Sequence, residues 1–145
     1  MSGFALVPRV LGLDYGRARI GVAISDELGM LAHPLATISA TNLREATKRI
    51  AEIARENKVE RVVLGMPRQM DGGLGLAAAD VNAFAEKLRA ALPCEVVLWD
   101  ERLTTAAANR ALHDAGRRTK QTRGIIDQVA AQMILQSYLD RCRTG

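Results

Sequence analysis

Three carboxylates stand where apolar segments of the sequence begin or end. Asp14 ends the strand-forming run 10–14, and Glu101 directly follows the run 95–100. Asp127 lies near the start of the last helical segment, on one helical stripe with three apolar residues, Ala130, Ala131 and Ile134. An unpaired charge in such a position is costly, and carboxylates that lie together repel one another. The pattern therefore predicts one site at the rim of a sheet, where a cation compensates the three acids.

The cation that suits a set of carboxylate ligands is a hard, oxygen-preferring one. Mg²⁺ or Mn²⁺ fits this description, and two such ions about 4 Å apart activate water and stabilise the leaving oxygen of a phosphodiester. Each acid also has an ordinary structural explanation, as a turn former (Asp14), an ion-pair partner (Glu101) or a residue that complements a helix dipole (Asp127). Because all three lie on elements that converge, the sequence favours metal-dependent hydrolysis of phosphodiesters.

Basic residues point to a polyanionic partner. The formal net charge is +4 and the isoelectric point about 9.5. The excess gathers before the last helix, where one acid, Asp114, accompanies Arg110, Arg117, Arg118, Lys120 and Arg123. This clustering suits nucleic acid, with a solvated basic loop as the alternative. Thr104 is most economically a helix cap, and from a position close to Glu101 it could also contact a substrate phosphate.

The first half of the chain reads as a hairpin, a third strand and a helix. The runs 10–14 and 19–25 are close enough for an antiparallel hairpin, and a third strand near 32–38 contains Pro34, which marks an edge or a bend. Asn42 and Glu45 have the spacing of a capping box. They open a helix that ends near residue 57.

The second half alternates strands and helices. Strands are predicted at 61–65 and 95–100, with a helix between them that stops before Pro93. The glycine-rich segment 66–75, which contains Asp71, is either a loop that cradles phosphate or a structural turn. A further helix from Thr104 or Thr105 to about 115 and a last one from 124 to about 142 complete the chain.

This order predicts a single α/β domain over residues 1–145. Its sheet is mixed, an antiparallel three-strand meander followed by parallel strands, with helices on both faces, which is the ribonuclease H-like layout. Residues 1–10 lack the apolar core of a signal peptide, and no apolar run has transmembrane length. Two cysteines without a CxxC pattern favour a reducing cytoplasmic setting, and we expect no membrane partner.

Four segments together resemble the YqgF/RuvX family of bacterial ribonuclease H-like proteins. They are GLDYGRARIGVAISD (12–26), LGMPRQMDG (64–72), DERLTT (100–105) and DQVAAQMILQSYL (127–139). The family is described both as Holliday junction resolvases and as nucleases that mature small-subunit ribosomal RNA. The resemblance spans nearly the whole chain and departs from the family pattern in small ways, with Met66 in place of a common leucine and fewer lysines in the basic stretch.

The resemblance implies catalytic and metal-binding roles for Asp14, Glu101 and Asp127. It also implies that Arg19, together with the basic residues 117–123, holds backbone phosphates. The expected activity is that of a Mg²⁺- or Mn²⁺-dependent nuclease acting in 5′-end processing of pre-16S rRNA, by a monomer or a weak homodimer. Alternatives left open are a junction resolvase acting on branched DNA and a nucleic-acid-binding module without catalysis. An actin-like or sugar-kinase-like ATPase shares the Asp-x-Gly hairpin but needs a second lobe, for which 145 residues leave no room.

Overall fold

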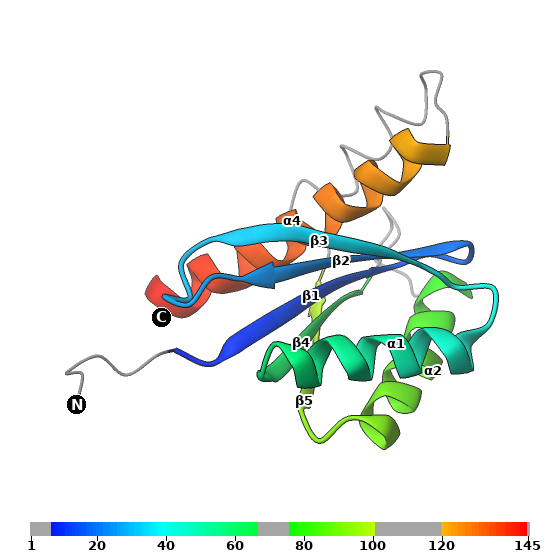
Figure 1. Cartoon of the computed structure of the whole chain (residues 1–145), viewed down its shortest axis with the longest axis horizontal. Coiled ribbons are helices and arrows are strands. Elements are labelled where there is room, and N and C mark those ends of the chain that lie inside the picture. Colours follow the sequence, from blue (N-terminus) through cyan, green and yellow to red (C-terminus); the bar gives the residue numbers. More distant parts are fainter. Residues whose placement is uncertain (1–6, 67–75, 101–119, 145) are drawn as a thin grey trace.

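The computed structural model describes residues 7–66, 76–100 and 120–144. In the helical ends 76–78, 120–123 and 143–144, the description is limited to the backbone. Five strands form one mixed sheet in the order β3-β2-β1-β4-β5 (Figure 1). The strands are β1 (Arg9–Tyr15), β2 (Arg19–Ser25), β3 (Ala32–Ser39), β4 (Val59–Met66) and β5 (Glu95–Asp100). β2 runs antiparallel to both β1 and β3, whereas β4 is parallel to β1 and to β5. The predicted meander and parallel pair are confirmed.

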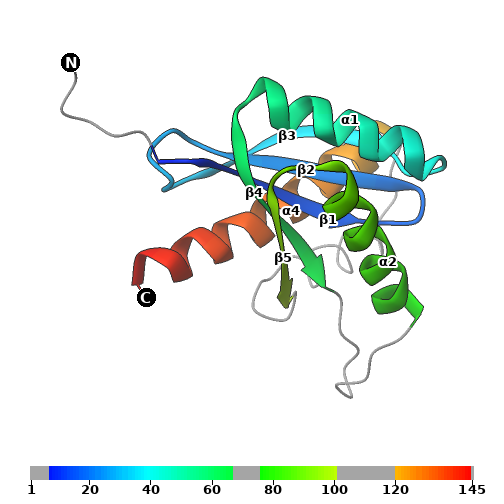
Figure 2. The ribbon, with the colours of Figure 1, turned by 90° about the horizontal axis from the view of Figure 1, so that it is seen from below.

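Helices cover both faces of this sheet. α1 (Leu43–Glu56) and α2 (Leu76–Ala91) lie on one face, and α4 (Lys120–Thr144) crosses the other (Figures 1 and 2). Two apolar clusters correspond to these two layers. The first contains Phe84 and Ile50 from the paired helices, and the second contains Ile134 and Leu135 from α4. The alternating side chains of the strands supply the other half of each cluster.

Local signals place the ends of α1 well. The side chain of Asn42 accepts a hydrogen bond from the backbone N–H of Glu45 at 3.2 Å, as the predicted capping box requires. The last helix begins earlier than predicted, at Lys120, with Gly124 inside it. A glycine weakens a helix and so resembles a boundary in the sequence. Here the carbonyl of Gly124 accepts a hydrogen bond from Thr37 Oγ1 at 2.8 Å, which ties this turn to β3. The helix predicted from 104 or 105 to 115 lies outside the described residues.

The outer strand β3 is held to α4 by glutamine side chains spaced four residues apart. Gln128 donates to Thr37 Oγ1 at 3.0 Å and Gln132 donates to the carbonyl of Ala32 at 2.9 Å. Gln136 accepts from the N–H of Ala32 at 2.8 Å. Positions i, i+4 and i+8 share one helix face, so a single stripe serves both backbone and side-chain groups of the edge strand. Pro34 stands beside a shift of register between β2 and β3, as the prediction of an edge or a bend implied.

No helix within the three described ranges is long and apolar enough to span a membrane.

Candidate metal centre

The carboxyl ends of three parallel strands lie at the same end of the sheet. β1, β4 and β5 run in the same direction, with Leu13 beside Leu64 and Leu64 beside Leu98. β5 ends on Asp100, which pairs with Met66 at the end of β4. Asp14 therefore lies at the same end of the sheet as Asp100. In open α/β sheets, this is the edge where ligands bind. The strand that leads to Glu101 thus ends on the same side of the sheet as Asp14.

The side chain of Asp14 belongs to the face that α4 covers. Leu11 and Leu13 contribute to the core beneath α1 and α2, so the alternation of β1 turns Asp14 toward the opposite face. Its partner across the antiparallel ladder is Gly21. Only 6% of Asp14 is exposed. Aspartate is rarely buried to this extent unless it is paired, which makes Asp14 a candidate for a functional site.

Gly21 gives α4 room to approach this point. A Cβ added at position 21 would overlap the main-chain carbonyl of Asp127 and would lie 3.1 Å from its Cβ. The helix therefore places Asp127 directly over the residue that pairs with Asp14. The stripe predicted for this helix is confirmed, because Ala130, Ala131 and Ile134 are all buried against the sheet. Two of the three predicted acids, Asp14 and Asp127, thus converge around Gly21.

The carboxylate of Asp127 is held by Arg19. Arg19 Nε donates to Asp127 Oδ2 at 2.6 Å, and the side chains are 35% and 13% exposed, respectively. A charge-assisted contact of this length in a partly desolvated place is among the stronger hydrogen bonds of a protein. The family resemblance indicated a basic residue at position 19 but assigned it to phosphate. No local sequence signal indicates its contact with Asp127, which lies 108 positions further along the chain.

The hairpin that carries these residues contacts α2 mainly through Tyr15, with an exposed ion pair beside that contact. The ring of Tyr15 stacks on Phe84 with centroids 4.9 Å apart, and Arg17 Nε lies 3.3 Å from Asp80 Oδ2. The pKa of Tyr15 is raised above its usual value, mainly by burial and to a smaller extent by the nearby carboxylate of Asp80. Tyr15 is therefore a neutral packing residue at neutral pH. It fixes the turn that separates Asp14 from Arg19.

The remaining predicted site residues fall largely outside the described part of the chain. These are Glu101, Thr104, Arg117 and Arg118, together with the side chains of Lys120 and Arg123 and the loop containing Asp71. Within the described residues, no group of three or more histidine, cysteine or acidic side chains is placed to hold a metal ion. The donors present nevertheless suit Mg²⁺ or Mn²⁺, since Asp14 and Asp127 offer shielded carboxylate oxygens on adjoining elements.

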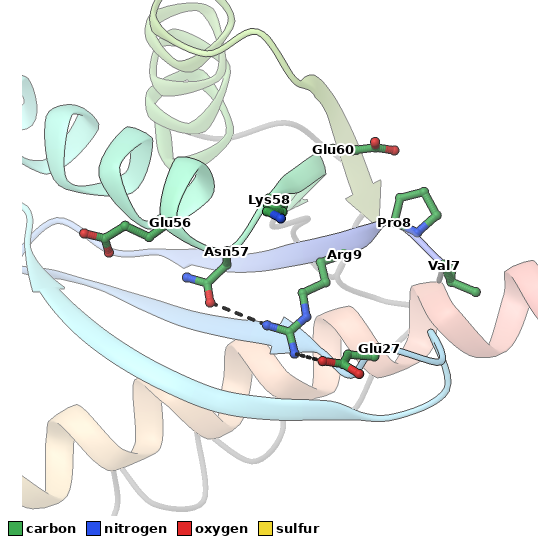
Figure 3. A pocket seen from close by; sticks show the side chains of 8 residues that line it. All are labelled: Val7, Pro8, Arg9, Glu27, Glu56, Asn57, Lys58 and Glu60. Atoms are coloured by element: carbon green, nitrogen blue, oxygen red, sulfur yellow. Dashed lines mark hydrogen bonds and ion pairs between the residues drawn. The ribbon is translucent and has the colours of Figure 1, made fainter. Parts of the chain in front are cut away.

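A hollow of about 400 Å³ lies at the opposite edge of the sheet, where β1 and β4 begin (Figure 3). Arg9 spans it, with Nη1 3.5 Å from Asn57 Oδ1 and Nη2 3.9 Å from Glu27 Oε1. Glu56, Lys58 and Glu60 also line it, so the lining contains both acidic and basic side chains. This mixed lining differs from the site at the other end of the strands, where the carboxylates of Asp14 and Asp127 converge. The hollow therefore belongs to a separate surface.

The chain matches a known protein family over most of its length. The family model named RuvX, described as "Holliday junction resolvase", matches residues 8–141. A protein of Halalkalibacterium halodurans is 45% identical over 135 residues, which are 92% of this chain and 96% of that protein. A protein of Moorella thermoacetica is 48% identical over 133 residues, 92% of this chain and 95% of that protein. Both are named "Putative pre-16S rRNA nuclease".

Solved structures of low sequence identity share the fold. Thermus thermophilus RuvC in complex with a Holliday junction substrate matches with a TM-score of 0.53 and 16% identity, over 96% of this chain and 97% of that chain. The Fowlpox virus Holliday junction resolvase matches with a TM-score of 0.54 and 16% identity, over 92% of this chain and 99% of that chain. The ribonuclease H-like fold predicted from the order of elements is therefore confirmed. The extent of the family match and the identity to its relatives show that the chain belongs to the RuvX family.

Proposed function

We propose that the protein is a divalent-metal-dependent nuclease that processes the 5′ end of pre-16S rRNA in the cytoplasm. The observation that carries the proposal is the convergence of Asp14 and Asp127 around Gly21, at the edge where the parallel strands end. The relatives that are 45% and 48% identical over nine-tenths of the chain support rRNA as the substrate.

In this proposal three carboxylates hold the metal. Asp14 and Asp127 provide oxygen ligands from β1 and α4, and Glu101 is the third. β5 ends on Asp100, the residue before Glu101, and its Val97 and Trp99 pack toward α4. Bound Mg²⁺ or Mn²⁺ supplies an activated water and neutralises charge on the phosphoryl group. The low exposure of Asp14 and Asp127 would limit competition from bulk water for the ligand positions on these two residues.

The basic residues before and within the start of α4 would bind the nucleic acid. Arg117, Arg118, Lys120 and Arg123 precede Asp127 closely in sequence, and Thr104 follows Glu101 closely. Contacts from such side chains to backbone phosphates orient the chain of nucleotides without reading its bases. They would therefore set the position of the scissile bond relative to the acids.

A second candidate substrate is branched DNA. The matching family model carries the description of a Holliday junction resolvase. Both substrates are cleaved by the same phosphodiester chemistry, so the acids alone do not separate them. The shape of the nucleic acid bound by the basic residues would decide between them.

The deciding experiment is a cleavage panel with the purified full-length protein. The substrates are a pre-16S rRNA fragment, an unstructured single-stranded RNA and a four-way DNA junction, each with Mg²⁺, Mn²⁺ or EDTA. We expect metal-dependent cleavage of the precursor at a defined position. Asp14→Asn should lower that rate by about 10²-fold or more, whereas Asp80→Asn, which alters an acid paired with Arg17 away from the site, should leave it close to the parental rate. Selective cutting of the junction would favour the second candidate, and binding without cleavage under all conditions would indicate a silent module.

A further inference from the structure

Two neighbouring positions on one face of β2 hold the same residue of α4. Arg19 and Gly21 are two apart in a strand, so they share a face. Gly21 accommodates the main-chain carbonyl of Asp127, and Arg19 contacts the carboxylate of Asp127. The strand therefore fixes both the backbone and the side chain of one predicted metal ligand.

The contact between Arg19 and Asp127 uses one oxygen of the carboxylate and leaves the other outside this hydrogen bond. It joins Arg19 Nε to Asp127 Oδ2 at 2.6 Å, so Oδ1 lies outside the bond. Asp127 is 13% exposed and faces the Asp14–Gly21 pair, where a second carboxylate is buried. A positive charge at this place offsets the repulsion between the two acids. It also restricts Asp127 to one orientation.

Arg17, two residues earlier, shows what an ordinary ion pair on the same hairpin looks like. Its Nε lies 3.3 Å from Asp80 Oδ2, and the two side chains are 75% and 42% exposed. Exposed pairs of this kind contribute little to stability. Arg17 is therefore a matched control for Arg19, with the same residue type, the same hairpin and an aspartate partner.

We infer that Arg19 is a positioning residue, which orients the carboxylate of Asp127 for a divalent ion rather than binding substrate phosphate. The inference rests on the proposed function, because it assumes that Asp127 is a metal ligand. Groups that orient metal ligands through hydrogen bonds typically change metal affinity by about 10- to 100-fold when they are removed. Arg19 fits this description by distance, by burial and by its place beside Gly21.

The test compares Arg19→Gln, Arg19→Lys and Arg17→Gln in the full-length protein. Mn²⁺ binding is measured by titration calorimetry, and thermal unfolding in EDTA verifies that each variant is folded. Binding of a pre-16S rRNA fragment is measured in EDTA over a range of salt concentrations, and kcat and KM are measured with Mn²⁺. The same metal titration is repeated for Arg19→Gln combined with Asp127→Asn, and for Asp127→Asn alone.

We expect Arg19→Gln to weaken Mn²⁺ binding by about 10-fold or more and to lower kcat, while KM and the salt slope of RNA binding stay near the parental values. Arg19→Lys should recover part of the loss, and Arg17→Gln should resemble the parent. In the Asp127→Asn background, Arg19→Gln should have little further effect on metal affinity, because the two residues act as one unit.

Three results would overturn the inference and leave the proposed function standing. Unchanged Mn²⁺ affinity with a salt slope reduced by about one would assign Arg19 to a phosphate contact. Tighter Mn²⁺ binding by Arg19→Gln would show that the guanidinium competes with the metal. Equal losses in the parental and Asp127→Asn backgrounds would mean that Arg19 acts by another route. A parent that binds no divalent ion would instead overturn the proposed function, and the inference with it.

Discussion

The main-chain carbonyl of Asp127 occupies the space that a Cβ at position 21 would need. α4 can therefore cross β2 at this point only because residue 21 is glycine. The same relationship brings Asp127 over the ladder pair formed by Gly21 and Asp14. The close packing of α4 on β2 at Gly21 thus sets the position of Asp127 in the candidate metal centre.

Replacing Gly21 by alanine should displace α4 and disturb the site. The added methyl group meets backbone, which cannot rotate away, so we expect a loss of about 1–3 kcal/mol in the free energy of unfolding. The cleavage rate should fall by at least about 10-fold, because Asp127 moves relative to Asp14. Denaturant unfolding and single-turnover cleavage measure the two effects.

Gly124→Ala is the matched control for this substitution. Gly124 of α4 lies against β3, where an added Cβ would be 3.4 Å from Thr37 Oγ1, an ordinary contact. Alanine in place of a helical glycine should raise the free energy of unfolding by about 0.5–1 kcal/mol. A similar loss in both variants would mean that the close approach at Gly21 is not what limits α4.

Asp127→Asn should separate catalysis from folding. Asparagine keeps one side-chain oxygen that can accept from Arg19 but removes the negative charge that a divalent ion requires. We expect the cleavage rate to fall by about 10²-fold or more. The free energy of unfolding in EDTA should change by no more than about 1 kcal/mol, because the loss of the ion pair with Arg19 and the relief of repulsion with Asp14 oppose each other. Added Mg²⁺ should stabilise the variant less than the parent. Parental cleavage by a destabilised variant would identify Asp127 as a structural helix residue.

The basic residues should contribute affinity without sequence preference. Changing Arg117, Arg118, Lys120 and Arg123 to glutamine removes four charges from the stretch before Asp127. RNA binding measured over a range of salt concentrations should weaken similarly for all sequences, and its salt slope should fall by about one for each lost phosphate contact. An unchanged slope would identify these residues as solvated surface.

Asp26 should make the β2–β3 connection sensitive to acid. Its Oδ1 accepts from the N–H groups of Met30 at 2.9 Å and Leu28 at 3.2 Å. The bond from Met30 is the main reason why the pKa of Asp26 is lowered below its usual value. A lowered pKa in the folded state adds stability above the unfolded pKa of about 3.9, and this stability is lost as the pH falls through the folded value.

The parent should therefore be more stable than Asp26→Asn at pH 7. The difference should shrink once the pH falls below about 4, because the parent carboxylate then becomes protonated. Thermal unfolding of both proteins from pH 7 to pH 2.5 would measure it. A difference that stays constant with pH would show that the hydrogen-bond geometry alone, without the charge, stabilises the turn.

Much of the secondary structure could be predicted from local sequence, because its causes are local. The cap at Asn42, the alternation in β2 and the apolar stripe after Asp127 depend on residues within a few positions of one another. The same local reading set the start of α4 at Gly124, four residues late, because the helical propensity of glycine is poor but a contact with Thr37 holds it in the helix.

The candidate site likewise has features that local sequence predicts and features that depend on the tertiary structure. The sequence by itself determined which acids lie at the ends of strands and on the buried stripe of a helix, and so identified Asp14 and Asp127. Only the tertiary structure decided that both lie next to Gly21, that this glycine admits the helix and that Arg19 binds Asp127, a residue 108 positions away. Contacts between residues so distant in sequence depend on strand order and on how closely a helix packs, and neither is specified by spacing along the chain.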